Sequence, residues 1–420
     1  MSAQAPLSIR CSEYERIETP SPPTMDEFLR AIWENSWRWE SLSLHFQIGT
    51  RQLYFLEFTA PQLRDLTIEN GDRELGGLFG EYEPGICILK ILGNPTLRNL
   101  SLNGIGLQWN NLNLPQLRML SLTNVEEGAP SLEKLMETLK MASGLEHLAL
   151  HGVDIVSSVE GEELNPQPIH LTSLLSLWLD KLPKGLAHQL IRVIRSPQLK
   201  SMRVCGLFPE HLENSTSDQN PYHHFFQVLI PVLSSSAKGL TLSNEPFSST
   251  MYLNTDNWTM PWLANFPAGR TADLGVQIED PISATPKMVN FITSNRIVVP
   301  LTVVANASDD GFGATSSTTS CFLAEVLGKL PMVTKISTQT LADALNILIF
   351  LGSIRRDEET GRWGWACPQL KVLNFGGIDG LAHEHYQSFL DARYSDGSPL
   401  LIEGEVVHRP PMVEYENSMF

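Results

Sequence analysis

Histidine and aspartate side chains, which can act in catalysis or bind metal ions, occur in pairs at two places in the middle of the chain. His223 and His224 precede a run of apolar residues, and Asp309 and Asp310 lie in a stretch rich in serine, threonine and glycine. Neighbouring residues of a helix point about 100° apart, which suits joint metal binding poorly. A zinc site needs three or four converging ligands. We therefore predict no metal and no cofactor; an enzyme built on these four residues, or a separate ligand-binding domain, is the alternative.

Sequence motifs of the large enzyme classes do not occur in this chain. There is no G-x-S-x-G, no P-loop, no H-E-x-x-H and no G-x-G-x-x-G that opens a helix after a strand. The five cysteines are far apart and include no C-x-x-C pair, which argues against a disulfide framework and against a structural zinc site. The sequence therefore predicts a protein without catalytic residues, not an enzyme.

The charge of the chain restricts its partners. The 420 residues include 30 Lys and Arg against 47 Asp and Glu, so the net charge is −17. Binding to nucleic acid or to an anionic membrane needs a concentrated positive field, so neither partner is expected. No apolar run approaches the roughly 18 residues of a membrane span, and no secretory signal is visible at the start. We expect a cytoplasmic or nuclear protein that is not secreted.

A six-residue pattern, L-x-x-L-x-L, recurs along the chain. Seven clear copies begin at Leu63, Leu97, Leu117, Leu145, Leu174, Leu199 and Leu370, with a plausible eighth at Trp39. From 63 to 199 the steps are 34, 20, 28, 29 and 25 residues, which bracket the leucine-rich-repeat period. Proline lies two residues before the first leucine in five copies, where it stops a preceding helix and leads into an extended strand. The pattern predicts one strand for each copy.

Amphipathic segments between the copies predict the second layer of the fold. Residues 130–139 and 186–194 carry apolar side chains at helical spacing, so each helix has one apolar stripe to bury against the strands. We therefore predict an α/β fold, a leucine-rich-repeat solenoid of irregular repeat length. Its curved parallel sheet would form the concave side, and its helices the convex side.

The predicted organisation has three parts. Residues 1–35 form a linker with a short helix, residues 36–395 form the solenoid, and residues 396–420 form a tail. Irregular insertions fall at about 209–332, where a separate small domain is the alternative. Length alone would suggest roughly two to four ordinary domains. A repeat array has no fixed core size, so the whole chain is compatible with a single solenoid.

The concave face supplies the candidate partner-binding residues. The leucines of each copy point inward, so the second, third and fifth positions point outward on strands about 4.8 Å apart. Arg64, Arg98 and Arg118 occupy second positions and would form a basic ladder. Trp178 and Arg203 occupy fifth positions of consecutive copies, and both residue types are enriched in binding hot spots. These five residues are predicted to bind a protein partner; the alternative is that the arginines are solvated edge residues.

Several segments resemble a known family. They are Ser-Trp-Arg-Trp-Glu-Ser-Leu-Ser-Leu at 36–44, the repeated Pro-Gln-Leu-(Arg/Lys)-x-Leu units, and Cys-Pro-Gln-Leu-Lys-Val-Leu at 367–373. In these segments the chain resembles the fungal F-box and leucine-rich-repeat proteins of mushroom-forming species. The resemblance implies repeats that bind the substrate protein of a ubiquitin ligase. Residues 1–35 contain no motif of the Leu-Pro-x-Glu type, so a Skp-type adaptor is implied as a partner only if an F-box lies upstream.

Overall fold

The computed structural model describes the N-terminal half of the chain most fully. Its described residues are 5–12, 34–46, 53–70, 86–92, 96–110, 112–155, 167–183, 186–207, 223–236, 239–244, 248–254, 273–279, 281–305, 326–327, 329–338, 341–352, 354–356, 363–365, 367–375, 387, 391 and 401–403. They fall into two compact units. Unit 1 comprises residues 1–207, 214–232 and 264–276, and unit 2 comprises 208–213, 233–263 and 277–420.

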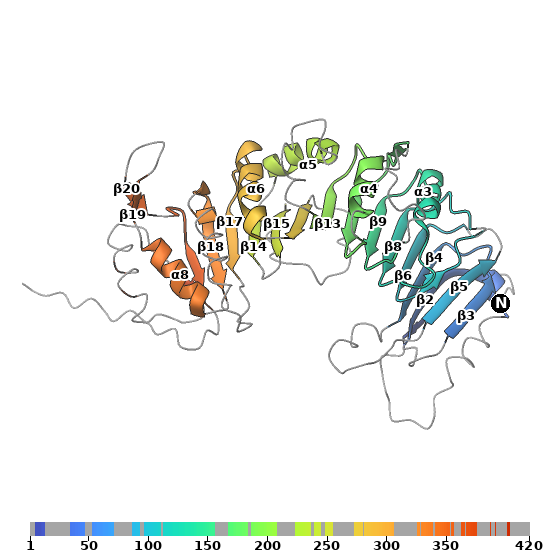
Figure 1. Cartoon of the computed structure of the whole chain (residues 1–420). Helices are drawn as coiled ribbons and strands as arrows, with labels where there is room; N and C mark the ends of the chain where they lie inside the picture. Colours follow the sequence, from blue (N-terminus) through green and yellow to red (C-terminus); the bar gives the residue numbers. More distant parts are fainter. Residues whose placement is uncertain are drawn as a thin grey trace, which may run out of the picture. The chain divides into compact units, whose positions relative to one another are not determined.

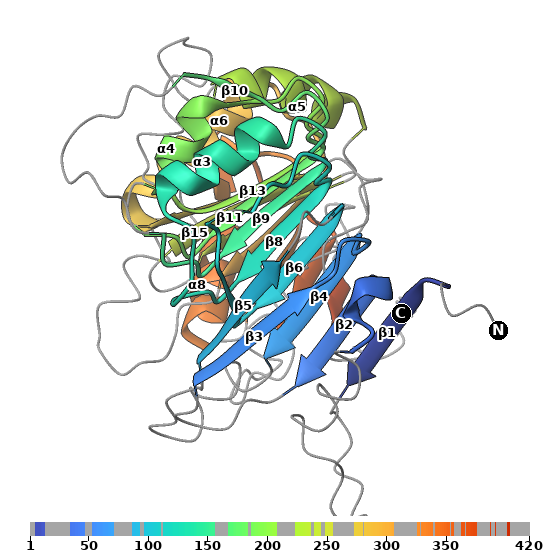
Figure 2. The ribbon, with the colours of Figure 1, turned by 90° about the vertical axis from the view of Figure 1, so that its right-hand side faces the viewer.

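Unit 1 contains a sheet of eight parallel strands, which lie side by side in the order of the chain (Figures 1 and 2). The strands are β1 (Leu7–Ser12), β2 (Trp39–Phe46), β4 (Asp65–Asn70), β6 (Asn99–Asn103), β8 (Met119–Thr123), β9 (His147–His151), β11 (Ser176–Asp180) and β13 (Ser201–Leu207). Each copy of L-x-x-L-x-L from Trp39 to Leu199 leads into one of these strands. The predicted mixed α/β class with a large parallel sheet is confirmed.

One face of this sheet forms the core of unit 1. In β4, β6 and β8 every second residue is buried, so the leucines all lie on the same side. Leu66, Leu100, Leu120 and Leu148 are paired in register on consecutive strands, and each is 0% exposed. Burial of a leucine side chain contributes roughly 1.5–3 kcal/mol, so a stack of this length is a major source of stability.

The helices of unit 1 lie together over one face of the sheet (Figure 2). This is the leucine face, because its side chains are buried, whereas the side chains of β4, β6 and β8 on the other face are partly exposed. The helices are α3 (Leu132–Met141), α4 (Leu186–Val193) and α5 (His223–Ser236), whose last four residues belong to unit 2. The Ser131 hydroxyl caps α3 by accepting a hydrogen bond from the Lys134 backbone N–H at 3.2 Å, which satisfies one donor of the first turn. Helices α3 and α4 occupy the two segments for which the sequence predicts amphipathic helices.

Short elements complete unit 1. A three-stranded parallel sheet consists of β3 (Leu53–Thr59), β5 (Ile86–Leu92) and β7 (Gly106–Leu107). A two-stranded sheet joins β10 (Ile169–His170) to β12 (Ile194–Arg195), and the 3-10 helix η1 spans Ser36–Arg38.

Unit 2 is less regular. Its strands are β14 (Gly239–Asn244), β15 (Ser248–Asn254), β17 (Leu301–Ala305), β18 (Val333–Thr338), β21 (Val372–Asn374) and β22 (Leu401–Glu403). Strand β16 (Asp273–Glu279) is divided between the two units. The helices of unit 2 are α6 (Pro281–Ser294) and α8 (Leu341–Leu351), and β19 (Ile354–Arg356) pairs with β20 (Trp363–Trp365).

Two features of unit 2 differ from the expected succession of parallel strands. Strands β14 and β15 pair antiparallel, within the region where insertions are predicted. The segment predicted as a tail contains β22, whose apolar residues Leu401 and Ile402 extend the sheet by pairing parallel with β21.

Candidate functional site on the open face of the sheet

The face of the eight-stranded sheet opposite the leucines is here called the open face. Its middle row consists of the fifth positions of the copies, one residue from each of the seven strands β2 to β13. In register these are Ser43, Thr67, Ser101, Ser121, Ala149, Trp178 and Arg203. From β2 to β8 the row carries only short hydroxyl side chains, all of them partly exposed. Beyond β8 the row is largely covered: Ala149 is 2% and Arg203 4% exposed, and Trp178 between them is partly exposed.

The three predicted ladder arginines each lie directly before one of the neighbouring strands β4, β6 and β8. Main-chain hydrogen bonds of 2.7–2.8 Å connect Glu40, Arg64, Arg98, Arg118 and Glu146 in that order. The two outer arginines are paired with the flanking glutamates: Arg64 Nη1 lies 2.7 Å from Glu40 Oε1, and Arg118 Nη1 lies 3.3 Å from Glu146 Oε1. Arg98 is exposed and forms no ion pair with another residue that the structure describes. The ladder is therefore less positive than the arginines alone suggest.

Trp178 and Arg203 are brought together as predicted, because they are directly paired between β11 and β13. Their exposure differs. Trp178 is partly exposed, whereas Arg203 is only 4% exposed and interacts within the chain. The neighbouring side chains of Ser201 and Cys205 on the same strand are buried as well. The expectation that Arg203 is presented to a partner is therefore wrong, since its guanidinium group is enclosed by the protein.

A polar cluster that the sequence analysis missed surrounds Trp178. His151 Nδ1 lies 2.8 Å from Asp180 Oδ2, and the His151 and Trp178 rings lie 5.8 Å apart at 54°. Burial raises the pKa of Asp180, but hydrogen bonds from His151 and Cys205 and the nearby positive charges outweigh it, so the pKa lies below its ordinary value. Burial, with the Asp180 charge, raises the pKa of Cys205, which keeps its thiol protonated.

The signal for this cluster is present in the sequence. His151 and Asp180 are both seventh positions of the repeated pattern and are directly paired in register. Side chains at the seventh position point to the same face as those at the fifth, because successive residues of a strand alternate between faces.

A second hydrogen-bonded chain lies on β2 and β4. Ser43 Oγ lies 3.4 Å from His45 Nε2, and His45 Nδ1 lies 2.6 Å from Glu69 Oε2. The order of groups matches that of a nucleophile, a base and an acid. Strand β2 is paired on both sides, with β1 and with β4. Its main-chain N–H groups are thus engaged in the sheet, and they are not free to stabilise an oxyanion beside Ser43.

We predict that Asp180→Asn lowers the free energy of unfolding at pH 7 by about 1–3 kcal/mol, because it removes a charge-assisted hydrogen bond from a partly buried site. The folded-state pKa of Asp180 is depressed, so its contribution is fully present above the unfolded value of about 3.9. The contribution is lost as the pH falls through the folded pKa. The difference between variant and wild type should therefore shrink below about pH 4.

Urea unfolding at several pH values measures this difference. Asp154→Asn is the matched control, because it removes the same charge from an exposed position in the same unit. Its effect should stay within about 0.5 kcal/mol at every pH. Equal effects of the two substitutions at pH 7 would contradict the prediction.

The residues of the alternative site lie mostly outside the described part of the chain. Asp309, Asp310 and the side chain of His223 are not described, whereas His224 Nε2 lies 2.9 Å from the Ile194 carbonyl oxygen. Within the described ranges, no three residues of the types His, Cys, Asp and Glu converge as metal ligands would. No helix of those ranges is long and apolar enough to span a bilayer.

Comparison with known proteins yields no relative: no family model, no curated protein and no solved structure matches the chain.

Proposed function

We propose that the chain is a non-catalytic scaffold for protein–protein interaction, a leucine-rich-repeat solenoid that binds a partner on the open face of its sheet. The single observation that carries this proposal is the unbroken register of the open face. One residue from each of the seven strands β2 to β13 lies in line across the sheet of unit 1. Such stacked repeats create extended surfaces typical of binding proteins.

The composition of the open face supports this function. Hydroxyl, amide and imidazole groups offer both donors and acceptors of hydrogen bonds to a partner backbone. Trp178 adds an apolar anchor of the kind that dominates binding energy at interfaces. Of the three ladder arginines, only Arg98 keeps the proposed role of binding the partner, because Arg64 and Arg118 already have acidic partners within the chain.

A sharper form of the proposal makes the chain resemble the substrate-binding repeat domain of an F-box ubiquitin-ligase receptor. It rests on the family resemblance of residues 36–44 and of the repeated Pro-Gln-Leu units. The test is co-purification with a Skp-type adaptor, with the substrate-binding role assayed separately. Absence of the adaptor would remove the ligase role and leave the scaffold role standing.

For the scaffold role we predict that Trp178→Ala and Ser121→Arg each reduce partner recovery at least about tenfold in quantitative affinity purification, because one removes an anchor and the other places a bulky charge in the middle row. Gln198→Arg adds the same charge at an exposed position outside the row and should leave recovery unchanged. If both open-face variants, shown to be folded by circular dichroism, recover the same partners as wild type, the proposal fails.

A further inference from the structure

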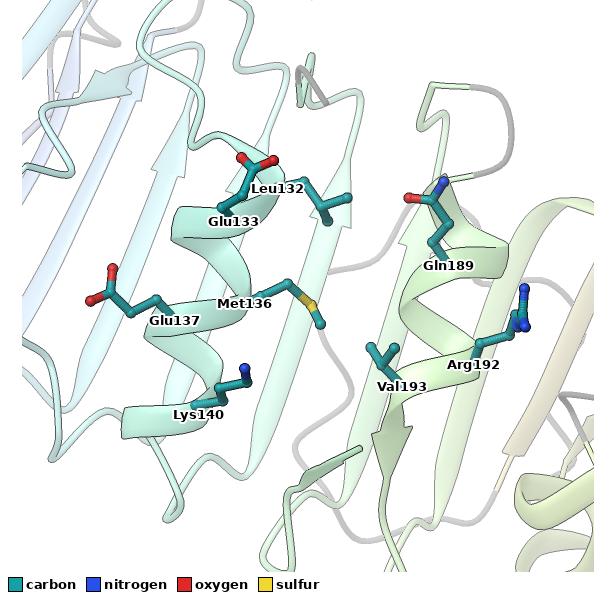
Figure 3. A pocket seen from close by; sticks show the side chains of 8 residues that line it. All are labelled: Leu132, Glu133, Met136, Glu137, Lys140, Gln189, Arg192 and Val193. Atoms are coloured by element: carbon teal, nitrogen blue, oxygen red, sulfur yellow. The ribbon is translucent and has the colours of Figure 1, made fainter. Parts of the chain in front are cut away.

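A groove lies between helices α3 and α4 of unit 1, on the side of the sheet opposite the open face. It contains an open cavity of about 280 Å³. Figure 3 shows Leu132 and Met136 of α3 and Val193 of α4 projecting into the space between the two helices. The floor and walls are therefore apolar, and the volume is enough for one or two large side chains.

The groove lies beside the connection between β9 and β11, in whose described residues no helix occurs. The connections from β8 to β9 and from β11 to β13 each contain a helix, α3 and α4 respectively. In the connection between β9 and β11, the described residues 152–155 and 167–175 contain only the two-residue strand β10. Helices α3 and α4 thus face each other across the repeat between β9 and β11, whose described residues contain no helix.

The charged residues around the groove are distributed unevenly along its axis. The two helices run in the same direction in Figure 3, with Glu133 at the end where α3 begins and Lys140 at the end where it finishes. Arg192 is the basic residue in the last turn of α4, so both C-terminal ends carry a positive charge. Glu133 and Lys140 are seven positions apart, a distance of about 10 Å along a helix.

We infer that this groove binds an amphipathic helix of a partner protein, antiparallel to α3 and α4. The partner's acidic N-terminal turn lies near the C-terminal ends of α3 and α4, where Lys140 and Arg192 supply positive charge, and its basic C-terminal turn lies near Glu133. This charge order is also the one that a helix macrodipole favours in an isolated helix, so the partner would need no unusual sequence. Large apolar residues at i, i+3 or i+4, and i+7 would fill the cavity.

The lining favours a helix over a small polar ligand. Small-molecule sites carry polar groups that converge on the ligand. Here Figure 3 shows the Glu137 carboxylate directed away from α4 and the Arg192 guanidinium directed away from α3. An interface usually has an apolar centre and a polar rim. Polar side chains along the outer edges of the groove can therefore contact the polar residues that flank the apolar stripe of a bound helix.

The test uses a fluorescent fifteen-residue amphipathic peptide with an acidic first turn, a basic last turn and one Leu/Met stripe. Fluorescence anisotropy with the full chain is measured at about 0.01 M salt, where charges are weakly screened. We expect a Kd on the order of 10 to 100 μM. Lys140→Glu with Arg192→Glu should weaken binding about tenfold, and Met136→Glu, which places a charge in the cavity, by at least about tenfold.

The matched control is Lys200→Glu with Lys371→Glu, which changes the net charge equally at exposed residues outside the groove and should alter the Kd less than about twofold. Trp178→Ala on the open face should also leave the Kd unchanged, which separates this site from the proposed scaffold function. The inference is overturned by the absence of peptide binding, by an equal loss in the control, or by undiminished binding to Met136→Glu.

Discussion

Gly106→Ala is expected to lower the free energy of unfolding of unit 1 by roughly 3 kcal/mol or more. A Cβ atom at this position would overlap the Glu127 carbonyl oxygen and would lie 2.9 Å from the Gly128 Cα. Both obstacles are backbone atoms, which cannot move aside as the end of a flexible side chain would. The two glycines therefore face each other at a distance that no side chain tolerates.

The surrounding hydrogen bonds explain why the backbones at Gly106 and Gly128 cannot move apart to make room for a Cβ atom. The Leu107 backbone N–H donates to the Gly128 carbonyl oxygen at 3.0 Å, and the Trp109 indole N–H donates to the same oxygen at 3.1 Å. Gly128 itself has φ of +73°, which glycine adopts without strain. Separating the two segments would break both hydrogen bonds and expose the indole, which is now 6% exposed.

Gly144→Ala is the matched control, since a Cβ atom there meets nothing within 4 Å. It should leave stability within about 0.5 kcal/mol of wild type or raise it slightly through the reduced entropy of the unfolded chain. Urea unfolding followed by circular dichroism measures both variants, and hydrogen exchange of the peptides around residues 104–129 locates the damage. A loss for Gly106→Ala no greater than that for Gly144→Ala would refute the steric argument.

Leu148→Ala is expected to lower the free energy of unfolding by about 2–5 kcal/mol. Leu148 is 0% exposed and lies in register between Leu120 and Leu177, which are equally buried. Its truncation leaves a cavity in the middle of the leucine stack, where neighbours held by the strands on both sides cannot close it. The cost therefore combines lost burial with lost packing contacts.

Met119→Ala provides the comparison on the other side of the sheet. Met119 is partly exposed and lies on the open face, next to His147 in register. Shortening it should cost less than about 1 kcal/mol. Equal losses for Met119→Ala and Leu148→Ala in urea unfolding would show that the leucine side is not the principal core of unit 1.

The regular part of unit 1 could be predicted from the sequence because its signals are local. The spacing of the repeated pattern locates the strands, and the apolar periodicity of residues 132–141 and 186–193 locates α3 and α4. The same alternation predicts that Trp178 and Arg203 lie side by side. That alternation also assigns Arg203 to a face, but it carries no information about what packs there, so the burial of its guanidinium could not be predicted.

Long-range contacts account for the remaining differences. The ion pairs of Arg64 and Arg118 depend on the conformations of long side chains on separate strands. The antiparallel β14 and β15 and the strand β22 lie where the pattern is degenerate or absent. The partner-binding role of the open face stays a prediction, since neither register nor burial identifies what binds there.

The parallel register of unit 1 has a consequence for how the chain folds. Asn99 pairs with Asp65 and with Met119, which are 34 and 20 residues away. No step in the eight-stranded sheet closes a much longer loop, so the entropy lost on forming each new strand pair is similar along the sheet. Contact order is therefore low for a parallel sheet of this size, and folding can spread from any well-packed strand pair to its neighbours. During synthesis, each completed strand would present an unpaired edge until the next 20 to 34 residues emerge, which is the interval in which the nascent chain is most prone to aggregate.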